Sequence, residues 1–358
     1  MNAPTREPSA ATAFDHPEFD DHEQVLFCRD SASGLSAIIA LHDTRLGPAA
    51  GGCRMWNYAS SGEALTDVLR LSRGMTYKNA LIGLDYGGGK SVIIGDPRRG
   101  KTEAKLEAFG RFIERLGGNY ITAEDVGIGS DDMEVIARTT GYALGTASRG
   151  LGDPSPFTAY GVFLGIKAAA KHVFGTEDLQ GRRVSVQGLG HVGFALARHL
   201  GDAGARLIVS DIHAPAIERA VAELGATRVD PDEAHAADAD IFAPCALGGG
   251  LNATTIPEIR ARIVAGAANN QLATDSDGDA LVNRGILYAP DYAINAGGVA
   301  AVLMPCDGAD RDAVLRRIES IGDTLATIFA RAQATGQSTA AVADGLAEER
   351  LDRTRRAA

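Results

Sequence analysis

The sequence predicts an α/β fold with two domains, the second of which contains a doubly wound parallel sheet. Its 358 residues exceed the size of one typical domain. A stretch rich in Gly, Ser and Pro at residues 145–157 marks a connection, and strands and helices alternate regularly after it. We therefore predict a mobile N-terminal tail, an α/β domain, the sheet domain and a C-terminal helix that returns to the first domain. Their bounds are 1–22, 23–147, 148–330 and 331–358.

The first domain is predicted to combine strands with amphipathic helices. Apolar residues recur at helical spacing over residues 63–81 and 102–118, and Gly117 and Gly118 supply a stop signal at the end of the second run. Short apolar runs bounded by turn residues predict strands. These strands are 24–30, 34–43, 91–96 and 119–122.

The second domain has the alternation that is typical of a parallel sheet. Helical periodicity covers residues 192–204 and 214–225, and a β-rich run precedes and follows each of them. The predicted strands are 182–187, 205–211, 239–245, 262–269 and 286–290. Apolar residues at helical spacing return over residues 311–350 and predict the helices that end the chain.

Composition and charge restrict the classes of partner. The formal net charge of −11 and the pI near 5.2 disfavour nucleic acid and anionic membranes, because their phosphates would be repelled. The four cysteines lie far apart, so neither a metal site nor a disulfide framework is expected. No apolar run is long enough to span a bilayer, and the first residues lack the apolar core of a signal peptide. We expect a cytoplasmic protein that binds a small molecule.

A glycine pattern of the G-x-G-x-x-G type follows the strand 182–187, at Gly188, Gly190 and Gly193. In this pattern the first glycine permits a tight turn, the second lets the backbone approach a pyrophosphate, and the third lets helix and strand pack closely. The pattern predicts a Rossmann domain that binds a dinucleotide. The candidate cofactor-binding residues of this loop are Gly188, Leu189, Gly190, His191, Val192, Gly193 and Phe194.

Asp211 ends the next predicted strand, at about the distance where an acidic residue bonds the ribose hydroxyls of the cofactor. A carboxylate at this position would repel a 2′-phosphate, so the sequence favours NAD over NADP. The alternative role of Asp211 is to cap the N-terminus of the following helix. That reading requires the glycine pattern to be a coincidence.

The segment "GLDYGGGKSVIIG" at residues 83–95 raises the question of a phosphate-binding loop. A Walker loop needs a glycine at position 84, where this chain has Leu84, and it must open a helix. Lys90 is instead followed by the predicted strand 91–96. The sequence therefore argues against a nucleoside triphosphate site and leaves a lysine that the glycines allow a ligand to approach closely.

A second lysine, Lys78, lies twelve residues before Lys90. Either lysine alone could be a solvated surface charge. Together they could divide the work, since one can stay charged and bind a carboxylate. The other, if its pKa is lowered by burial and by a neighbouring cation, can act as a general base. Asp125, just after the strand 119–122, is a candidate acid, base or ion-pair partner.

Nine segments between about residues 25 and 300 together resemble the Glu/Leu/Phe/Val amino-acid dehydrogenase family, and within it the leucine dehydrogenases. They read "IIALHDTRLGPAAGGCRMW", "RLSRGMTYKNA", "GGGKSVIIGDP", "YITAEDVG", "PSPFTAYGV", "QGLGHVG", "FAPCALGG", "VAGAANNQL" and "GILYAPDYAINAGG". The resemblance implies an NAD-dependent enzyme that reversibly deaminates an apolar L-amino acid to its 2-oxo acid and ammonia, with hydride transfer to the nicotinamide. It also implies a homo-oligomer, either a dimer or an octamer.

The resemblance also implies roles for individual residues. Lys90 matches the catalytic base of the family, and Asp125 matches an aspartate that assists proton transfer. Lys78 matches the lysine that binds the substrate carboxylate, with help from the backbone at Gly51 and Gly52. The remaining motif positions match residues near the cofactor or the substrate amine: Thr158, Asn269 and Asn295 for the cofactor, and Asn270 for the substrate.

The resemblance places four residues around the substrate side chain: Ala50, Ala123, Val299 and Val302. Leucine dehydrogenases usually have a leucine at the position of Ala50, so a larger pocket is expected here. Apolar pockets discriminate only weakly by size, by about 1–3 kcal/mol per methylene. Leucine, valine and isoleucine are the expected substrates, and phenylalanine or another bulky apolar amino acid is the alternative. A sensor that binds dinucleotide or amino acid without catalysis is a third reading.

Overall fold

The computed structural model of the chain describes residues 12–146, 151–246 and 248–357. The chain forms two compact units. The first unit combines residues 1–76 with 85–147, and the second combines residues 77–84 with 148–358. Residues 77–84, which the sequence assigns to the first domain, therefore belong to the second unit.

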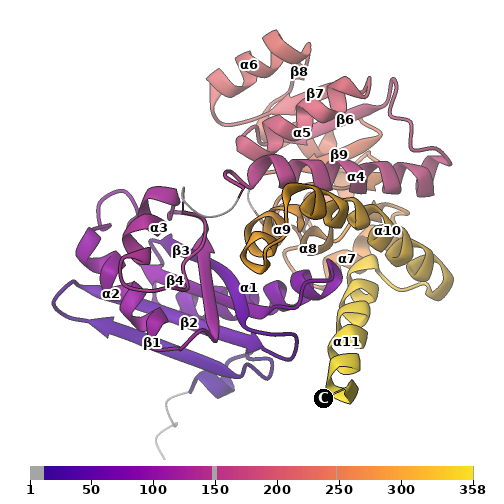
Figure 1. Cartoon of the computed structure of the whole chain (residues 1–358). Helices are drawn as coiled ribbons and strands as arrows, with labels where there is room; N and C mark the ends of the chain where they lie inside the picture. The colour runs from indigo at the N-terminus through magenta and orange to yellow at the C-terminus, as the bar shows by residue number, and fades with distance from the viewer. Residues whose placement is uncertain (1–11, 147–150, 247, 358) are drawn as a thin grey trace, which may run out of the picture. The chain divides into compact units, whose positions relative to one another are not determined.

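The first unit is built on a five-stranded mixed sheet (Figure 1) with the strand order β1-β2-β4-β3-β5. Its strands are β1 (Gln24–Asp30), β2 (Leu35–Asp43), β3 (Ala49–Trp56), β4 (Gly87–Ile94) and β5 (Tyr120–Glu124). β2 pairs antiparallel with β1 and β4, whereas β3 runs parallel to β4 and β5. The two central strands β4 and β3 are hydrogen-bonded on both sides, and they carry most of the candidate residues of this unit.

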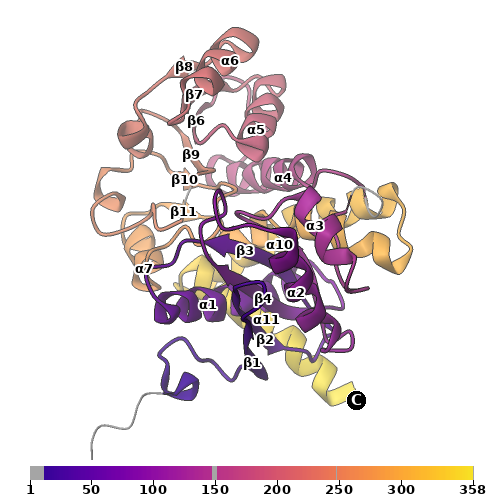
Figure 2. The same ribbon diagram turned by 90° about the vertical axis from the view of Figure 1, so that its left-hand side faces the viewer.

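Helices cover both faces of this sheet (Figure 2). They are α1 (Ser61–Leu81), α2 (Glu103–Glu114) and α3 (Ser130–Ala137). Phe109 of α2 packs in a buried cluster with Ile39 of β2, whereas Val68 of α1 packs in a second cluster with Ile38. Because neighbouring strand residues point to opposite faces, α2 and α1 lie on opposite sides of the sheet. The α1 face is the face of Val92, and hence of Lys90 two residues before it.

Two strands of the first unit differ from the sequence prediction. The sequence does not predict β3, because its segment "AAGGCRMW" contains two glycines and lacks the β-branched residues that favour strands. β4 begins at Gly87 and not at residue 91, so the three glycines and Lys90 lie inside a buried strand. The lysine segment is therefore a central strand of the sheet and not a loop.

The second half of the predicted N-terminal tail packs on the first unit. Residues 1–11 lie outside the described residues, whereas Ala13–Asp15 form a 3-10 turn. The imidazole Nε2 of His16 lies 3.0 Å from Thr66 Oγ1, and Nε2 of His22 lies 3.0 Å from Ser72 Oγ. Both contacts fix the chain before β1 to α1.

The second unit is built on a six-stranded parallel sheet with the order β11-β10-β9-β6-β7-β8. Its strands are β6 (Arg183–Gln187), β7 (Arg206–Ser210), β8 (Thr227–Arg228), β9 (Ile241–Pro244), β10 (Ile263–Val264) and β11 (Leu287–Tyr288). The doubly wound α/β fold is confirmed. The strand order reverses between β6 and β9, and doubly wound sheets bind ligands at such a switch point, beyond the carboxyl ends of the strands.

Helices surround this sheet and continue to the end of the described chain (Figure 1). They are α4 (Ser155–Phe174), α5 (His191–Asp202), α6 (Ala214–Leu224), α7 (Ser276–Asn283), α8 (Asp291–Ile294), α9 (Gly297–Leu303), α10 (Arg311–Thr335) and α11 (Thr339–Ala357). Further 3-10 turns lie at Pro231–Ala236, Ile256–Glu258 and Met304–Asp307. The sequence does not predict α4, whose first turn lies in the stretch at 145–157 that reads as a connection. Proline at a first helical turn is nonetheless favourable, since its missing N–H has no intrahelical partner there.

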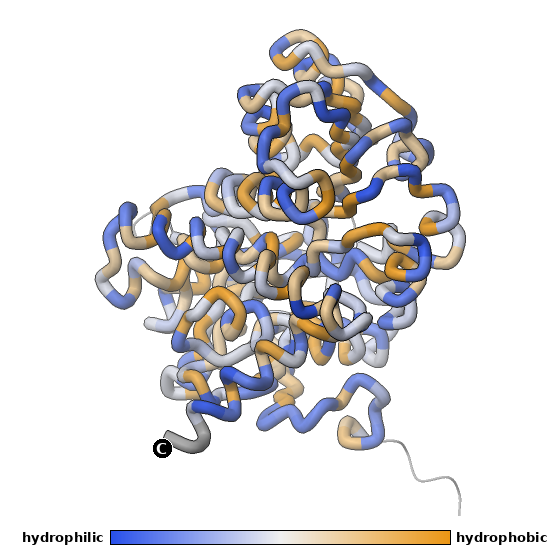
Figure 3. Tube along the Cα trace, turned by 90° about the vertical axis from the view of Figure 1, so that its right-hand side faces the viewer, coloured by the Kyte–Doolittle hydropathy of each residue, from blue (hydrophilic) through white to orange (hydrophobic). Residues whose placement is uncertain are grey.

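The last two helices have the amphipathic pattern that the sequence predicts. Val314, Ile318 and Leu325 of α10 are fully buried, and α10 packs against α4 and α9. Apolar and polar residues are interleaved along the trace (Figure 3). Within the described residues, no helix has both the length and the apolar character that a membrane span requires.

Candidate active site

Lys90 lies in the middle of β4, and the residue is only 5% exposed. Cross-strand register places Ala40 of β2 opposite it. On the other side Ala50 pairs with Gly88 and Cys53 with Ser91, so Gly52 of β3 lies level with Lys90. Gly52 pairs in turn with Ala123 of β5. Lys90 and Ala123 are therefore separated by one residue without a side chain.

The gap at Gly52 lets an acidic residue reach Lys90. Asp125 follows β5, and its Oδ2 lies 3.2 Å from Lys90 Nζ. A Cβ added at Gly52 would lie 2.9 Å from the Cβ of Asp125 and 2.5 Å from the carbonyl oxygen of Glu124. Any larger residue at position 52 would displace Asp125. The ion pair between Lys90 and Asp125 thus depends on this glycine.

The glycine triplet before Lys90 serves close packing. A Cβ at Gly88 would lie 2.0 Å from Thr76 Oγ1 of α1, and a Cβ at Gly89 would lie 2.8 Å from the ring of Tyr120. Gly51 of β3 is equally constrained, because its Cβ would lie 1.8 Å from the carbonyl oxygen of Gly89. These contacts bring α1 and β3 against β4 and so fix the strand that carries Lys90.

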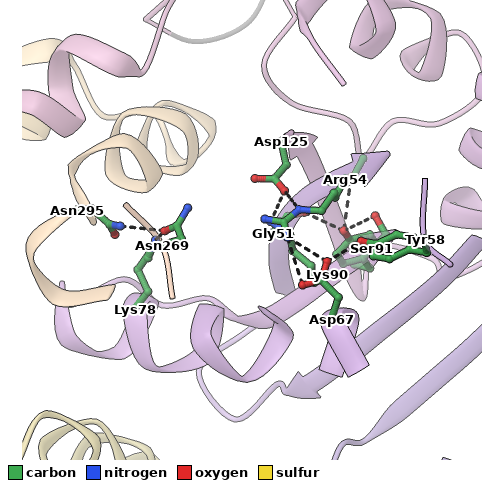
Figure 4. A network of polar contacts seen from close by, with 12 residues as sticks. Gly51, Arg54, Tyr58, Asp67, Lys78, Lys90, Ser91, Asp125, Asn269 and Asn295 are labelled. Carbon is green, nitrogen blue, oxygen red and sulfur yellow. Dashed lines mark hydrogen bonds and ion pairs between the residues drawn. The ribbon is translucent and has the colours of Figure 1, made fainter. Parts of the chain in front are cut away.

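Arg54 completes a charged network that the sequence analysis did not identify (Figure 4). Its Nε donates to Asp125 Oδ2 at 2.9 Å, and its Nη1 donates to Asp67 Oδ2 at 3.0 Å. Tyr58 Oη donates to the same Asp67 oxygen at 2.5 Å. Arg54 lies on the same face of β3 as Gly52, inside the segment "GGCRMW". Its place in this segment was the one feature of the sequence that could have indicated a role for Arg54.

The network keeps Asp125 ionised. Burial alone would raise the pKa of Asp125, but the charges of Lys90 and Arg54 outweigh burial and lower this pKa to about 2. Burial likewise disfavours the charge of Arg54, yet Asp125 and Asp67 raise its pKa overall. At neutral pH Asp125 is therefore an anion that can accept a proton or hold a cation.

A second cluster surrounds Lys78, which lies in the last turn of α1 and belongs to the second unit. Lys78 is buried, and its Nζ donates to Asn269 Oδ1 at 3.3 Å. Asn295 Nδ2 donates to the same oxygen at 2.8 Å and to the carbonyl oxygen of Ala267 at 3.0 Å (Figure 4). Asn295 Oδ1 is buried and has no hydrogen-bond partner among the described residues. A buried acceptor of this kind is available to a donor on a ligand.

Asp291 supports this cluster and was also missed by the sequence analysis. Its Oδ2 accepts a short hydrogen bond from the backbone N–H of Asn270. Asn270 has φ of 52°, a left-handed conformation that non-glycine residues rarely adopt. Burial raises the pKa of Asp291, although the charge of Lys78 and the Asn270 N–H oppose that rise. Asp291 lies in the segment "APDYAINAGG", where the asparagine drew attention and the aspartate did not.

The glycine loop of the second unit has the geometry that the pattern requires. Gly188 has φ of 97°, and a Cβ at Gly193 would lie 2.0 Å from the carbonyl oxygen of Gly188. A Cβ at Gly190 would meet nothing within 4 Å, so the backbone there is open to a ligand. Gly190 is also the N-cap of α5, which places the free N–H groups of the helix at the open side of the loop.

Asp211 holds the glycine loop from the end of β7. Its Oδ2 accepts the N–H of Leu189 at 2.5 Å, and its Oδ1 accepts the N–H of His213 at 2.7 Å. The N-cap of α6 is His213, so Asp211 does not take the capping role that the sequence left open. Its carboxylate instead accepts a hydrogen bond from the glycine loop.

The remaining predicted residues divide between the two units. Ala50 is buried on β3 and Ala123 is partly buried on β5, whereas Val299 and Val302 are partly buried on α9. Thr158 lies in the first turns of α4, and a Cβ at Gly298 would lie 2.4 Å from its Oγ1. The loop residues complete the set: His191 is exposed, Val192 is partly buried and Phe194 is buried. The described residues contain no cluster of His, Cys, Asp and Glu that could hold a metal ion.

Comparison with known families and proteins explains why these residues occur together. Residues 22–142 match the model of the Glu/Leu/Phe/Val dehydrogenase dimerisation domain. Residues 150–215 and 213–307 match the Glutamate/Leucine/Phenylalanine/Valine dehydrogenase model. The chain belongs to the Glu/Leu/Phe/Val dehydrogenase family. It is thus an amino-acid dehydrogenase, an oxidoreductase, and the enzymes of this family use NAD or NADP.

Named relatives match almost the whole chain. A leucine dehydrogenase from Geobacillus stearothermophilus is 53% identical over 346 residues, which cover 96% of this chain and 94% of the relative. A valine dehydrogenase from Streptomyces virginiae is 48% identical over 345 residues, which cover 95% of this chain and 96% of the relative. Among solved structures, L-tryptophan dehydrogenase from Nostoc punctiforme is 46% identical with a TM-score of 0.80, over 94% of this chain and 97% of that chain.

Proposed function

We propose that this member of the Glu/Leu/Phe/Val dehydrogenase family catalyses the reversible oxidative deamination of a branched-chain L-amino acid, with NAD as cofactor. The products are the 2-oxo acid, ammonia and NADH. The observation that carries the proposal is the buried Lys90–Asp125 pair, 3.2 Å apart, in a chain that is 53% identical to a leucine dehydrogenase over nearly its full length. We infer a cytoplasmic location from the sequence, as stated above.

The residues of the second unit fit NAD. The open backbone at Gly190 and the N-terminus of α5 suit a pyrophosphate, and Asp211 suits the ribose hydroxyls. Because the Asp211 carboxylate would repel a 2′-phosphate, NAD is preferred over NADP. Thr158, Asn269 and Asn295 would lie at the nicotinamide, which accepts the hydride of the substrate when the cofactor is bound. Asn295 Oδ1 supplies an unpaired buried acceptor for an N–H donor, in keeping with an amide or amine ligand.

The two lysines take different parts in this reaction. Lys78 binds the substrate carboxylate as a cation, with Gly51 and Gly52 contributing backbone groups and Asn270 binding the amine. Lys90, as the free amine, takes a proton from a water molecule as the water oxygen adds to the carbon of the imino acid. The protonated Lys90 gives this proton to the nitrogen and then takes the hydroxyl proton, so that the C=O bond forms as the C–N bond breaks and ammonia leaves. Asp125, held anionic by Lys90 and Arg54, accepts a hydrogen bond from the Lys90 amine and keeps it in place. Burial of Lys90 excludes bulk water, which strengthens each of these electrostatic contacts.

A substrate panel tests the proposal. The purified protein is incubated with NAD or NADP and with leucine, isoleucine, valine, phenylalanine, tryptophan or glutamate, while the absorbance of the reduced cofactor is recorded. We expect turnover with the branched-chain amino acids and NAD, weak turnover with NADP and none with glutamate. No turnover with any amino acid would refute the proposal and favour a sensor that binds without catalysis.

One observation favours a bulky aromatic substrate as a second candidate. Ala50 is buried on β3 and has the smallest side chain that still carries a Cβ, so it leaves more room than the leucine usual in leucine dehydrogenases. A solved relative at 46% identity is an L-tryptophan dehydrogenase. Higher kcat/KM for phenylalanine or tryptophan than for leucine in the panel would establish this candidate.

We also infer that the chain forms a homo-oligomer. Its first unit matches a dimerisation domain, and β1 is an edge strand with Phe27 61% exposed. A structural relative at 26% identity, a glutamate dehydrogenase from Thermus thermophilus, is a hetero-hexamer. Light scattering coupled to size exclusion distinguishes a dimer from an octamer, and a monomer would contradict the inference.

A further inference from the structure

The last turn of α1, which carries Lys78, ends in a closed hydrogen-bond motif. The N–H of Leu84 donates to the carbonyl oxygen of Asn79 at 3.0 Å, and the N–H of Gly83 donates to that of Ala80 at 3.2 Å. Gly83 has φ of 77°. These features define a Schellman motif, in which a left-handed glycine ends the helix. Lys78 is the residue immediately before this motif, so the motif sets where its backbone lies.

Two arginines from the C-terminal helices donate to carbonyl groups at this helix end. Arg350 of α11 donates from Nη1 to the carbonyl oxygens of Asn79, at 3.2 Å, and Ala80, at 2.7 Å. Arg317 of α10 donates from Nη1 to the carbonyl oxygen of Ile82 at 3.2 Å. All of these residues belong to the second unit. Two cations therefore lie at the negative end of the helix dipole, where positive charge is stabilising.

Gly83 is fitted to these arginines as well as to the turn. A Cβ added at Gly83 would lie 2.2 Å from Arg317 Nη1 and 3.9 Å from Arg350 Nη1. The missing side chain thus gives both guanidinium groups access to the helix end. The contact joins three helices, α1, α10 and α11. It requires the helix terminus, the glycine and both arginines.

Helix α11 also holds the segment that carries Asp291 and Asn295. Thr339 Oγ1 donates to the carbonyl oxygen of Tyr288 at 2.7 Å. Tyr292 Oη donates to Asp344 Oδ1 in a short hydrogen bond. One helix therefore contacts both the backbone that carries Lys78 and the segment whose Asn295 amide binds Asn269, the hydrogen-bond partner of Lys78.

We propose that Arg350 and Arg317 are positioning residues for Lys78: they fix the C-terminal turn of α1 so that the Lys78 ammonium is held where it binds the substrate carboxylate. The proposal rests on the proposed function of Lys78. The arginines do not touch the substrate. They act through the carbonyl groups of residues 79, 80 and 82, and their loss lets the last turn of α1 move while the dinucleotide loop stays intact.

The test compares four variants with the wild-type enzyme. Arg350→Met and Arg317→Met remove the donors, and Arg350→Lys keeps one charged donor. Arg331→Met is the matched control, because Arg331 is also on α10 and its Nη1 binds Glu349 Oε1 at 2.6 Å, in an exposed ion pair. Steady-state kinetics with leucine and NAD are measured for each variant. Inhibition by 4-methylpentanoate, which has the carboxylate but no amine, is compared with inhibition by 3-methylbutylamine, which has the amine but no carboxylate.

We expect Arg350→Met to raise the KM for leucine and the Ki of 4-methylpentanoate by about tenfold. A tenfold change corresponds to the loss of roughly one charge-assisted contact. The Ki of 3-methylbutylamine and the KM for NAD should change by less than about twofold. Arg317→Met should act in the same direction with a smaller effect, and Arg350→Lys should restore part of the affinity. Arg331→Met should match the wild type.

Several results would overturn the proposal. An unchanged leucine KM in folded Arg350→Met excludes a positioning role, and equal losses for both inhibitors indicate general loosening of the fold. If Arg350→Met does not fold, Gly83→Ala and Arg350→Lys carry the test, and an unchanged leucine KM in both contradicts the proposal. Wild-type protein without turnover refutes the proposed function and the inference with it. Turnover in the wild type with no effect in the variants refutes the inference alone.

Discussion

Lys90 and Lys78 are both buried lysines, yet the groups that their ammonium nitrogens contact differ in charge. Lys90 lies on a central strand beside an aspartate and an arginine, in a network of full charges. Lys78 lies at a helix end, where its Nζ donates to a neutral amide oxygen that a second amide also binds, and its charge acts on the buried carboxyl of Asp291. A network of charged side chains can gain or lose a proton and still keep its remaining ion pairs. We therefore propose proton transfer for the first region and carboxylate binding for the second.

The aspartates of the two regions show the same contrast. Asp125 lies beside two cations, and its pKa is lowered to about 2 in spite of its burial. Burial raises the pKa of Asp291, because the charge of Lys78 offsets only part of the desolvation. Asp125 therefore stays ionised at neutral pH, whereas neighbouring charges stabilise the ionised form of Asp291 less strongly.

The largest effect is expected for Lys90→Met. Loss of a general base lowers kcat by about a thousandfold, while the affinity for NAD should stay unchanged because the cofactor residues lie in the second unit. Steady-state kinetics and NADH fluorescence titration measure the two quantities. Lys101→Met, which removes a lysine paired with Asp132 at 2.6 Å in the same unit, is the control. A collapse of cofactor affinity in Lys90→Met would revive the phosphate-loop reading of this segment.

A different kinetic signature is expected for Lys78→Met. Loss of the cation that binds the carboxylate raises the KM for leucine by roughly 30-fold, with a smaller fall in kcat than in Lys90→Met. Lys167→Met provides the reference in the second unit, since Lys167 makes a long ion pair of 3.8 Å with Glu177. If Lys78→Met and Lys90→Met had the same ratio of KM effect to kcat effect, the division of labour would be wrong.

The two aspartates should differ in their effect on stability. The folded pKa of Asp125 is below its unfolded value near 3.8, so Asp125 stabilises the fold above pH 3.8, and this contribution is lost as the pH falls toward 2. Asp125→Asn should therefore lower the free energy of unfolding at pH 7 by about 2 kcal/mol. The folded pKa of Asp291 is raised, so its charge costs stability at neutral pH, and the cost disappears as the pH falls.

Asp291→Asn is the matched variant in the second region. Asparagine keeps an acceptor for the Asn270 N–H and removes the buried charge, so the free energy of unfolding at pH 7 should stay constant or rise. Urea unfolding at pH 7 and at pH 4 measures both variants. Equal destabilisation by Asp125→Asn and Asp291→Asn at pH 7 would contradict the contrast between the two regions.

The smallest effect on catalysis is expected for Ala50→Leu on β3. The added side chain fills space on the face of the sheet that also carries Lys90, so bulky substrates should lose more than branched-chain ones. The ratio of kcat/KM for phenylalanine to that for leucine should fall by about tenfold. Both substrates are measured on one protein, so any loss of active enzyme cancels in the ratio. An unchanged ratio would remove Ala50 from the substrate pocket.

The sequence predicted the parts of this fold that have clear periodicity. The helices α1, α2 and α5 and the strands β6 and β7 have regular apolar spacing, and all five appear near the predicted bounds. β3 was missed, since a strand rich in glycine has neither strong β propensity nor alternation. Its glycines are required by close contacts with β4 and Asp125, which only the assembled sheet reveals.

The candidate site was predictable for residues with a known motif and not for those defined by contacts. Lys90 and Asp125, 35 positions apart in sequence, are brought together by strand register, as the resemblance led us to expect. Arg54 and Asp291 had no chemical signal of their own, because an arginine on a strand and an aspartate after a proline are common. Their importance comes from burial and from partners distant in sequence. Neither of these can be read from the residue type or from its neighbours in the sequence.

The most direct test of the central claim is the affinity of 4-methylpentanoate, a carboxylate without an amine, for Lys78→Met and Lys90→Met. Isothermal titration calorimetry in the presence of NADH measures it without turnover. We predict that Lys78→Met weakens binding by at least about tenfold, whereas Lys90→Met changes it by less than about twofold. Strong binding to Lys78→Met together with lost binding to Lys90→Met would contradict the assignment of the two lysines.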